Sequence, residues 1–176
     1  MLAAVDRSAV KPYVVGHSAA SALAWVAADA RPDWLAGIAF LGGFPVSDGE
    51  TYAAFFPCVD GAMAFPGWEP FEGPDTADLD EDARGRIAAG AVAVPESVVY
   101  GTVRLRDQGR FDVSATLVCP EFSPDDAREA IAGGDQPELA ATRLPLVDLD
   151  AGQWPMFSCP GLLASVLAKA ATGSAR

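Results

Sequence analysis

The chain has 176 residues, of which 51% are hydrophobic and 20% are charged. These values fit one globular domain over residues 1–176 and exclude a disordered or collagen-like chain. Twelve basic against 24 acidic residues give a formal net charge of −12, which repels phosphate backbones and argues against a nucleic-acid partner.

Short apolar runs alternate with alanine-rich stretches along the chain, which is typical of a fold in which strands and helices alternate. The pattern therefore predicts an α/β protein with a mostly parallel sheet and flanking helices. The predicted strands are residues 13–15, 35–41, 113–119 and 145–149, and the predicted helices are residues 19–28, 124–132 and 161–171. Ser123 is expected to cap the second of these helices, with Pro124 in its first turn.

Residues 45–110 interrupt this alternation between the second and third predicted strands. The segment is too long for a simple connection, so we expect a partly helical, partly irregular lid, with a helix near residues 80–92. Residues 69–82 within it carry seven carboxylates and no cation. A calcium loop of the EF-hand type would need glycine at Ala83 and glutamate at Ala89, so a solvated acidic face is the preferred interpretation.

Other features of the composition bear on location and cofactors. Glycine and proline break the longest apolar stretch, residues 34–46, so no membrane span is expected. The first six residues lack the charged and apolar regions of a secretory signal, which favours a cytoplasmic protein. With one histidine and three widely spaced cysteines, the sequence predicts reduced thiols, no metal site and no other cofactor.

The segment that carries chemistry is Tyr13-Val-Val-Gly-His-Ser-Ala-Ala-Ser21. Here a predicted strand, a G-x-S-x-A turn and a predicted helix follow one another directly, which is the setting of a nucleophile elbow. Such a turn lifts the hydroxyl of Ser18 clear of the sheet, and it needs small neighbours so that strand and helix can approach. Gly16, Ala19 and Ala20 are small, although Ala20 stands where the usual pattern ends in glycine.

The sequence resembles the α/β-hydrolase family from about residue 11 to residue 171. Val14-Val-Gly-His-Ser-Ala-Ala20 is similar to the family's elbow. Ala151-Gly-Gln-Trp-Pro-Met-Phe157, with Cys159-Pro-Gly-Leu-Leu163 after it, is similar to the G-H-W-P-M segment that usually carries the catalytic histidine. The resemblance implies a nucleophile at Ser18, an oxyanion donor at the N–H of Ala19, and a small ester or related carbonyl substrate under the lid.

The match departs from the family at the catalytic base, because Gln153 stands where the histidine belongs. An amide cannot accept a proton near neutral pH. His17 precedes the nucleophile directly, where side chains point away from it, so a structural histidine is the preferred interpretation. For the acid of the triad, Glu121 is the nearest carboxylate, one or two residues from the position where the family has it. Ser123 is the alternative occupant of that position, and Asp48, after the second strand, is a fallback.

Only about fifteen residues precede the elbow, where the family ordinarily has further strands and the loop with the second oxyanion donor. The first strand is therefore expected at a sheet edge with unpaired backbone groups. Two hypotheses follow: a serine hydrolase homologue with reduced or lost activity, and a non-catalytic protein that binds a small molecule or forms a homodimer through this edge. A third is that the chain is a piece of a longer protein.

Overall fold

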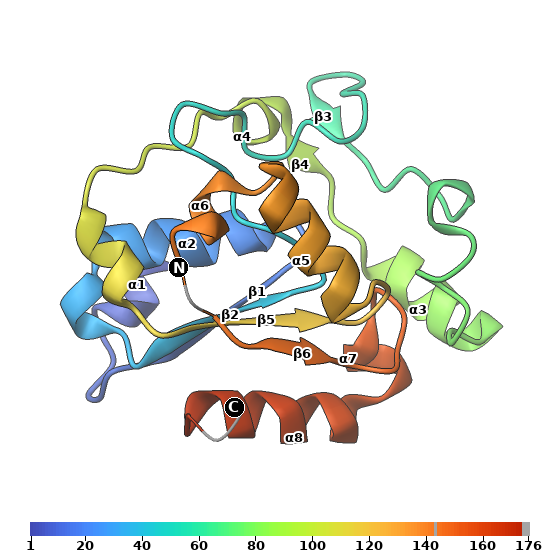
Figure 1. The fold of residues 1–176 in the computed structure, drawn as a ribbon. Coiled ribbons are helices and arrows are strands. Elements are labelled where there is room, and N and C mark those ends of the chain that lie inside the picture. Colours follow the sequence, from blue (N-terminus) through green and yellow to red (C-terminus); the bar gives the residue numbers. More distant parts are fainter. Residues whose placement is uncertain (143, 174–176) are drawn as a thin grey trace.

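The computed structural model describes residues 1–142 and 144–173, and a parallel sheet of four strands lies at its centre (Figure 1). The strands lie in the order β1 (Tyr13–His17), β2 (Gly37–Leu41), β5 (Ala115–Cys119) and β6 (Leu146–Asp148). The predicted mostly parallel α/β architecture is therefore confirmed. Each of these four strands overlaps one of the four predicted apolar runs, whereas the two-residue strands of the long segment between β2 and β5 were not predicted.

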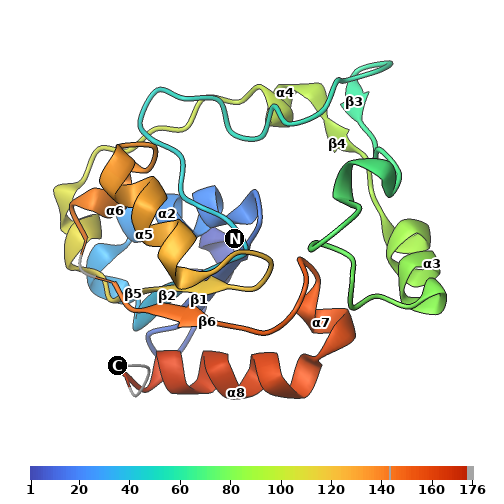
Figure 2. The ribbon, with the colours of Figure 1, turned by 45° about the vertical axis from the view of Figure 1, so that its right-hand side comes forward.

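Helices cover both faces of the sheet, but unequally. On one face lie α2 (Ala20–Ala30), α5 (Pro124–Gly133) and the short α6 (Pro137–Ala140), whereas α8 (Pro160–Ala171) lies on the other (Figures 1 and 2). Successive strand residues point to opposite faces, so Phe40 and Leu117 join the larger core under α2 and α5. Their neighbours Leu41 and Val118 pack with Leu163 of α8.

The cap of α5 follows its sequence. The hydroxyl of Ser123 accepts the N–H of Asp126 at 3.1 Å, and the carboxylate of Asp126 accepts the N–H of Ser123 at 2.9 Å. This reciprocal pair satisfies two backbone donors that the first helical turn cannot use. Pro124 and Gly134 then mark the start and the end of the helix, the latter with φ of 91°.

The long segment between β2 and β5, residues 42–114, projects beyond the carboxyl ends of the strands and arches over one side of the molecule (Figure 2). It contains β3 (Ala62–Met63), β4 (Val94–Pro95), α3 (Glu81–Gly90), α4 (Glu96–Val99), and 3₁₀ turns at Glu69–Phe71 and Gln108–Asp112. The remaining elements are α1 (Leu2–Val5), α7 (Pro155–Ser158) and a 3₁₀ turn at Pro32–Trp34. No helix in the described part of the chain is both long and apolar enough to cross a membrane.

Strand β1 lies at an edge of the sheet, as expected, because it pairs with β2 alone. On the face that α8 covers elsewhere, the side chain of Val15 is 42% exposed. Edge strands of this kind carry a row of backbone groups without sheet partners.

A buried charge network fixes the end of the long segment to α2 and α6. Arg110 is 5% exposed and lies 3.4 Å from the carboxylate of Asp29 and 3.2 Å from that of Glu138. Its guanidinium also stacks 4.3 Å from the ring centre of Phe111, and Glu138 accepts the indole N–H of Trp25. Because every charge in the network has an opposite partner, removing the cation would leave two carboxylates buried without one.

We predict that Arg110→Met lowers the free energy of unfolding by about 3 kcal/mol, as is usual when one member of a buried ion pair is removed. The matched control is Arg128→Met, since Arg128 pairs with Asp125 on the exposed surface of α5 and its loss should change stability little. Urea denaturation followed by circular dichroism measures both. Equal effects of the two substitutions would contradict the assignment.

Candidate functional site

Ser18 occupies a strained turn between β1 and α2. Its φ is 51°, a conformation that residues other than glycine seldom adopt. The turn is held from both sides, because the N–H of Ser18 donates to Leu41 O at 2.9 Å and Ser18 O accepts the N–H of Ser21 at 2.9 Å. The strand, sharp turn and helix that the sequence predicts here are all present.

Two glycines make this turn possible. A methyl group on Gly16 would overlap Ala20 O, and one on Gly43 would lie 2.6 Å from Ser18 O and 2.8 Å from Ser18 Cα. Gly16 was predicted from the elbow pattern. Gly43 was not, although the Gly42-Gly43 pair directly after the second predicted strand was a signal that this strand also ends against a close neighbour.

Ser18 opens onto a cavity of about 390 Å³ at the carboxyl ends of the strands. Its wall includes Ala19, and the N–H of Ala19 donates to no acceptor among the described residues. The rest of the wall combines aromatic and aliphatic side chains with two carboxylates, namely Phe44, Val46, Tyr52, Phe55, Glu50 and Asp135. Ser18 and Ala19 therefore line one partly apolar space.

Gln153 lies beside the end of β2 and is 9% exposed. Its side-chain Nε2 donates to Gly42 O at 3.3 Å, while its Oε1 is buried and accepts no hydrogen bond among the described residues. Glu121 Oε2 is buried and unpaired in the same way. The pKa of Glu121 is raised to about 7, chiefly by burial and also by the nearby charge of Asp75, against a hydrogen bond from its own backbone that lowers it.

The structure therefore gathers the predicted site residues around Gly42 and Gly43 without joining them into a hydrogen-bonded triad. Glu121 and Gln153 both lie against Gly42, and Ser18 lies against Gly43. Within the described residues, the hydroxyl of Ser18 makes no hydrogen bond to either of them.

His17 has a structural position. Its Nε2 lies 2.7 Å from the backbone oxygen of Gln153, to which it donates as a neutral ring. Burial lowers the pKa of His17, and the bond to the Gln153 carbonyl opposes that shift. The ring thus ties the residue 153 loop to the end of β1 and is not bonded to Ser18.

The alternative acids lie in other roles. The hydroxyl of Ser123 caps α5 by accepting the N–H of Asp126. Asp48 accepts the backbone N–H of Leu105 at 2.8 Å. Cys119, at the end of β5, is fully buried, and burial raises the pKa of its thiol to about 12. These side chains are engaged or inert, so Glu121 is the carboxyl that remains near Gln153.

The acidic segment of residues 69–82 is largely exposed, as expected, but it also makes hydrogen bonds to other parts of the site. Asp78 accepts the N–H of Gly152 at 2.8 Å, and the backbone oxygen of Asp75 accepts the N–H of Gln153 at 2.8 Å. Asp80 caps α3 by accepting the N–H of Ala83. The N–H groups of the loop that carries Gln153 find their acceptors in this segment, which the charge pattern alone did not indicate.

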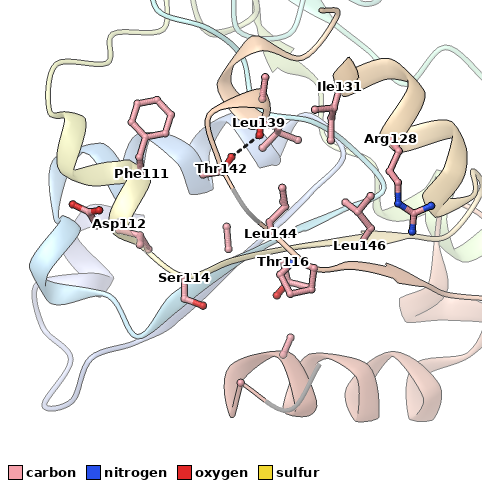
Figure 3. A pocket seen from close by; sticks show the side chains of 16 residues that line it. Phe111, Asp112, Ser114, Thr116, Arg128, Ile131, Leu139, Thr142, Leu144 and Leu146 are labelled. Atoms are coloured by element: carbon pink, nitrogen blue, oxygen red, sulfur yellow. Dashed lines mark hydrogen bonds between the residues drawn. The ribbon is translucent and has the colours of Figure 1, made fainter. Parts of the chain in front are cut away.

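A second hollow, of about 940 Å³, lies at the opposite end of the sheet (Figure 3). Thr116, Leu144 and Leu146 line it at the amino ends of β5 and β6, together with Ile131 of α5. In open parallel sheets, ligands bind at the carboxyl ends of the strands. The cavity at Ser18 is therefore the candidate site.

Comparisons with known proteins agree on the fold. No protein-family model matches the sequence, and no curated protein sequence matches it. Solved structures match nearly all of it. A methylesterase from Arabidopsis superposes with a TM-score of 0.72 at 15% identity, over 97% of this chain and 74% of that one. An extracellular α/β-hydrolase from a Paenibacillus species superposes with a TM-score of 0.69 at 15% identity, over 96% of this chain and 76% of that one.

A pyrethroid hydrolase from Sphingobium faniae is also similar, with a TM-score of 0.64 and 20% identity, over 99% of this chain and 76% of that one. The chain thus has the α/β-hydrolase fold. The resemblance drawn from the elbow and the Gly-Gln-Trp-Pro-Met segment is borne out at the level of the fold.

The packing around Ser18 generates a prediction. Gly43→Ala should destabilise the protein by about 1–3 kcal/mol, because the new methyl group meets the backbone of Ser18 and the turn cannot yield cheaply. Gly85→Ala is the control, since a methyl group there meets nothing within 4 Å and helix α3 should gain about 0.5–1 kcal/mol. Thermal and urea unfolding check both, and a neutral Gly43→Ala would contradict the tight junction.

Proposed function

We propose that this chain is a serine hydrolase homologue that takes a small ester or related carbonyl compound at Ser18, with activity reduced or lost because Gln153 replaces the general base. The observation that carries the proposal is the strained backbone of Ser18, with φ of 51°, at the mouth of a cavity. Strain of this kind persists only where the surroundings enforce it, and it places the hydroxyl beyond the sheet.

The groups around Ser18 suit the first half of acyl transfer. When Ser18 Oγ bonds to a carbonyl carbon, the carbonyl oxygen gains negative charge. We expect the N–H of Ala19, the residue that precedes α2 and lines the cavity, to donate to that oxygen. A cavity of about 390 Å³ with aromatic walls has room for a small ester.

The missing group is the proton acceptor. Gln153 offers a donor amide and an oxygen that is not basic, and His17 is bonded to a backbone carbonyl. The proton of Ser18 must therefore pass to water, and loss of a catalytic base typically costs several orders of magnitude in rate. The solved structures with this fold include proteins named as esterases and hydrolases, which supports the class of reaction.

A fluorophosphonate probe tests the nucleophile. Its phosphorus bonds to Ser18 Oγ as fluoride leaves, so mass spectrometry should find slow labelling at Ser18 and none in Ser18→Ala. Ser21→Ala is the matched control, because that buried hydroxyl, bonded to Gly16 O, should leave labelling unchanged. Labelling that is absent from the native chain, while a known serine hydrolase reacts, would remove the nucleophile.

Restoring the base makes a second test. Gln153→His should raise turnover of a p-nitrophenyl ester by about 10²–10⁴-fold, the usual contribution of general base catalysis. Gln153→Asn changes the side chain without supplying a base and should not raise it. An increase that survives in the double variant Ser18→Ala, Gln153→His would assign the activity to another residue.

The exposed edge favours a second candidate function, a non-catalytic interaction protein that forms a homodimer through β1. The observations behind it are that β1 pairs with β2 alone and that Val15 is 42% exposed. A second copy could add its own edge strand and satisfy the open backbone groups of both.

Light scattering after size exclusion should then report a dimer that Val15→Lys converts to a monomer, because a lysine on an edge strand opposes pairing. The control is Val10→Lys, since Val10 is 71% exposed but lies outside β1. A monomeric native protein would exclude this second function and leave the first untouched.

A further inference from the structure

Two buried oxygens that accept no hydrogen bond from any described residue lie on the same side of Gly42 near the candidate site. They are Oε2 of Glu121, which follows β5, and Oε1 of Gln153, which precedes α7. Both lie against Gly42, because a methyl group there would overlap Gln153 Oε1 and lie 3.1 Å from Glu121 Oε2. Gly42 itself has φ of 55°, so both its backbone conformation and the contact with Gln153 Oε1 disfavour a residue with a side chain.

The orientation of the Gln153 amide follows from its other contact. Nε2 donates to Gly42 O at 3.3 Å, and the opposite orientation would set two carbonyl oxygens against each other. Oε1 therefore faces the side on which Glu121 Oε2 lies.

Two acceptors in this position cannot stabilise each other unless one carries a proton. If Glu121 were ionised, its negative charge would be buried near the negative end of the Gln153 carbonyl dipole. Glu121 Oε2 and Gln153 Oε1 would then both lack a hydrogen-bond donor. A protonated carboxyl group has one O–H, and this single proton satisfies both oxygens at once.

We propose that Glu121 is held as a neutral carboxylic acid that donates its O–H to Gln153 Oε1, so that Glu121 is the positioning residue for the Gln153 amide. The proposal goes beyond the assignment of Ser18 and does not depend on it. It also reverses the pairing that a histidine would require, because an imidazole needs an ionised acid behind it whereas an amide oxygen needs a neutral one.

The charges around Glu121 favour the neutral form. Burial is the largest cause of its raised pKa, and Asp75 in the acidic segment raises it too, whereas a hydrogen bond from the backbone of Glu121 itself opposes the shift without reversing it. The thiol of Cys119 interacts with Glu121 from β5 and stays protonated, while His17 contacts the backbone of residue 153 and not its side chain. No lysine or arginine of the described residues forms an ion pair with Glu121.

A direct test is the titration of Glu121. Carbon-13 NMR of protein labelled at glutamate Cδ should show one carboxyl signal with its midpoint moved from about 4.5 to about 7, absent in Glu121→Gln. The Nε2 protons of Gln153, assigned by their loss in Gln153→Met, should shift with the same midpoint. If Glu121 did not donate to Gln153, its titration would not shift the Nε2 proton signals of Gln153. A Glu121 titration midpoint near 4.5 would overturn the proposal. Nε2 proton signals of Gln153 that do not change with the titration of Glu121 would overturn it too.

Stability supplies an independent readout. A carboxyl group with a raised pKa in the folded state stabilises that state below about pH 4.5 and loses this contribution as pH rises through about 7. The urea midpoint of the native protein should therefore fall across this window relative to Glu121→Gln, whose amide N–H still donates to Gln153 Oε1. His17 titrates in both proteins and cancels from the comparison.

The control is Glu129→Gln, on the exposed side of α5, which should keep the native pH profile. Glu121→Leu removes the donor and should lower the midpoint at every pH. If Glu121→Gln keeps the native profile, the two oxygens are bridged by water and the carboxyl group is ionised, which refutes the proposal. Neither measurement uses the reactivity of Ser18, so failure here and failure of the proposed function are separate results.

Discussion

The close approach of β1, α2 and the end of β2 is the constraint on which the rest of the site depends. Ser18 holds a positive φ because Gly16 lets α2 come within contact of the strand and Gly43 lets the neighbouring strand end against the serine backbone. The hydrogen bond that Ser18 donates to Leu41 O and the one that it accepts from the N–H of Ser21 then fix the turn from both sides. The packing of the surrounding sheet offsets the free-energy cost of this strained backbone. That packing is close enough only where the residues are small.

Much of the fold could be predicted from residue patterns because the forces involved are local or periodic. The apolar runs mark both faces of a buried parallel sheet, and the Ser123-Pro124 start and Gly134 end of α5 are capping chemistry that can be read from the sequence. The turn at Ser18 could be predicted for the same reason, since its residues are adjacent in the chain.

The remaining features of the site depend on contacts between distant segments. Nothing in the local sequence of residues 69–82 indicates that Asp78 accepts a hydrogen bond from a residue 74 positions later. The burial of Glu121 against Gly42 likewise arises only when the ends of β2 and β5 lie side by side. The charge pattern predicts the exposed acidic surface of residues 69–82, but it carries no information on which distant backbone donors lack acceptors.

The bonds from Asp75 and Asp78 to the loop at residues 152 and 153 have a mechanical consequence. They leave this stretch of the long arch and the glutamine loop no freedom to separate, and a methyl group on Gly152 would come within 2.5 Å of Asp78 Oδ1. A hinge that swung this stretch outward would carry the amide of Gln153 away from Gly42. The exposed part of the cavity wall, beside Phe55 and Asp135, belongs to other segments of the chain and is not held by these two bonds.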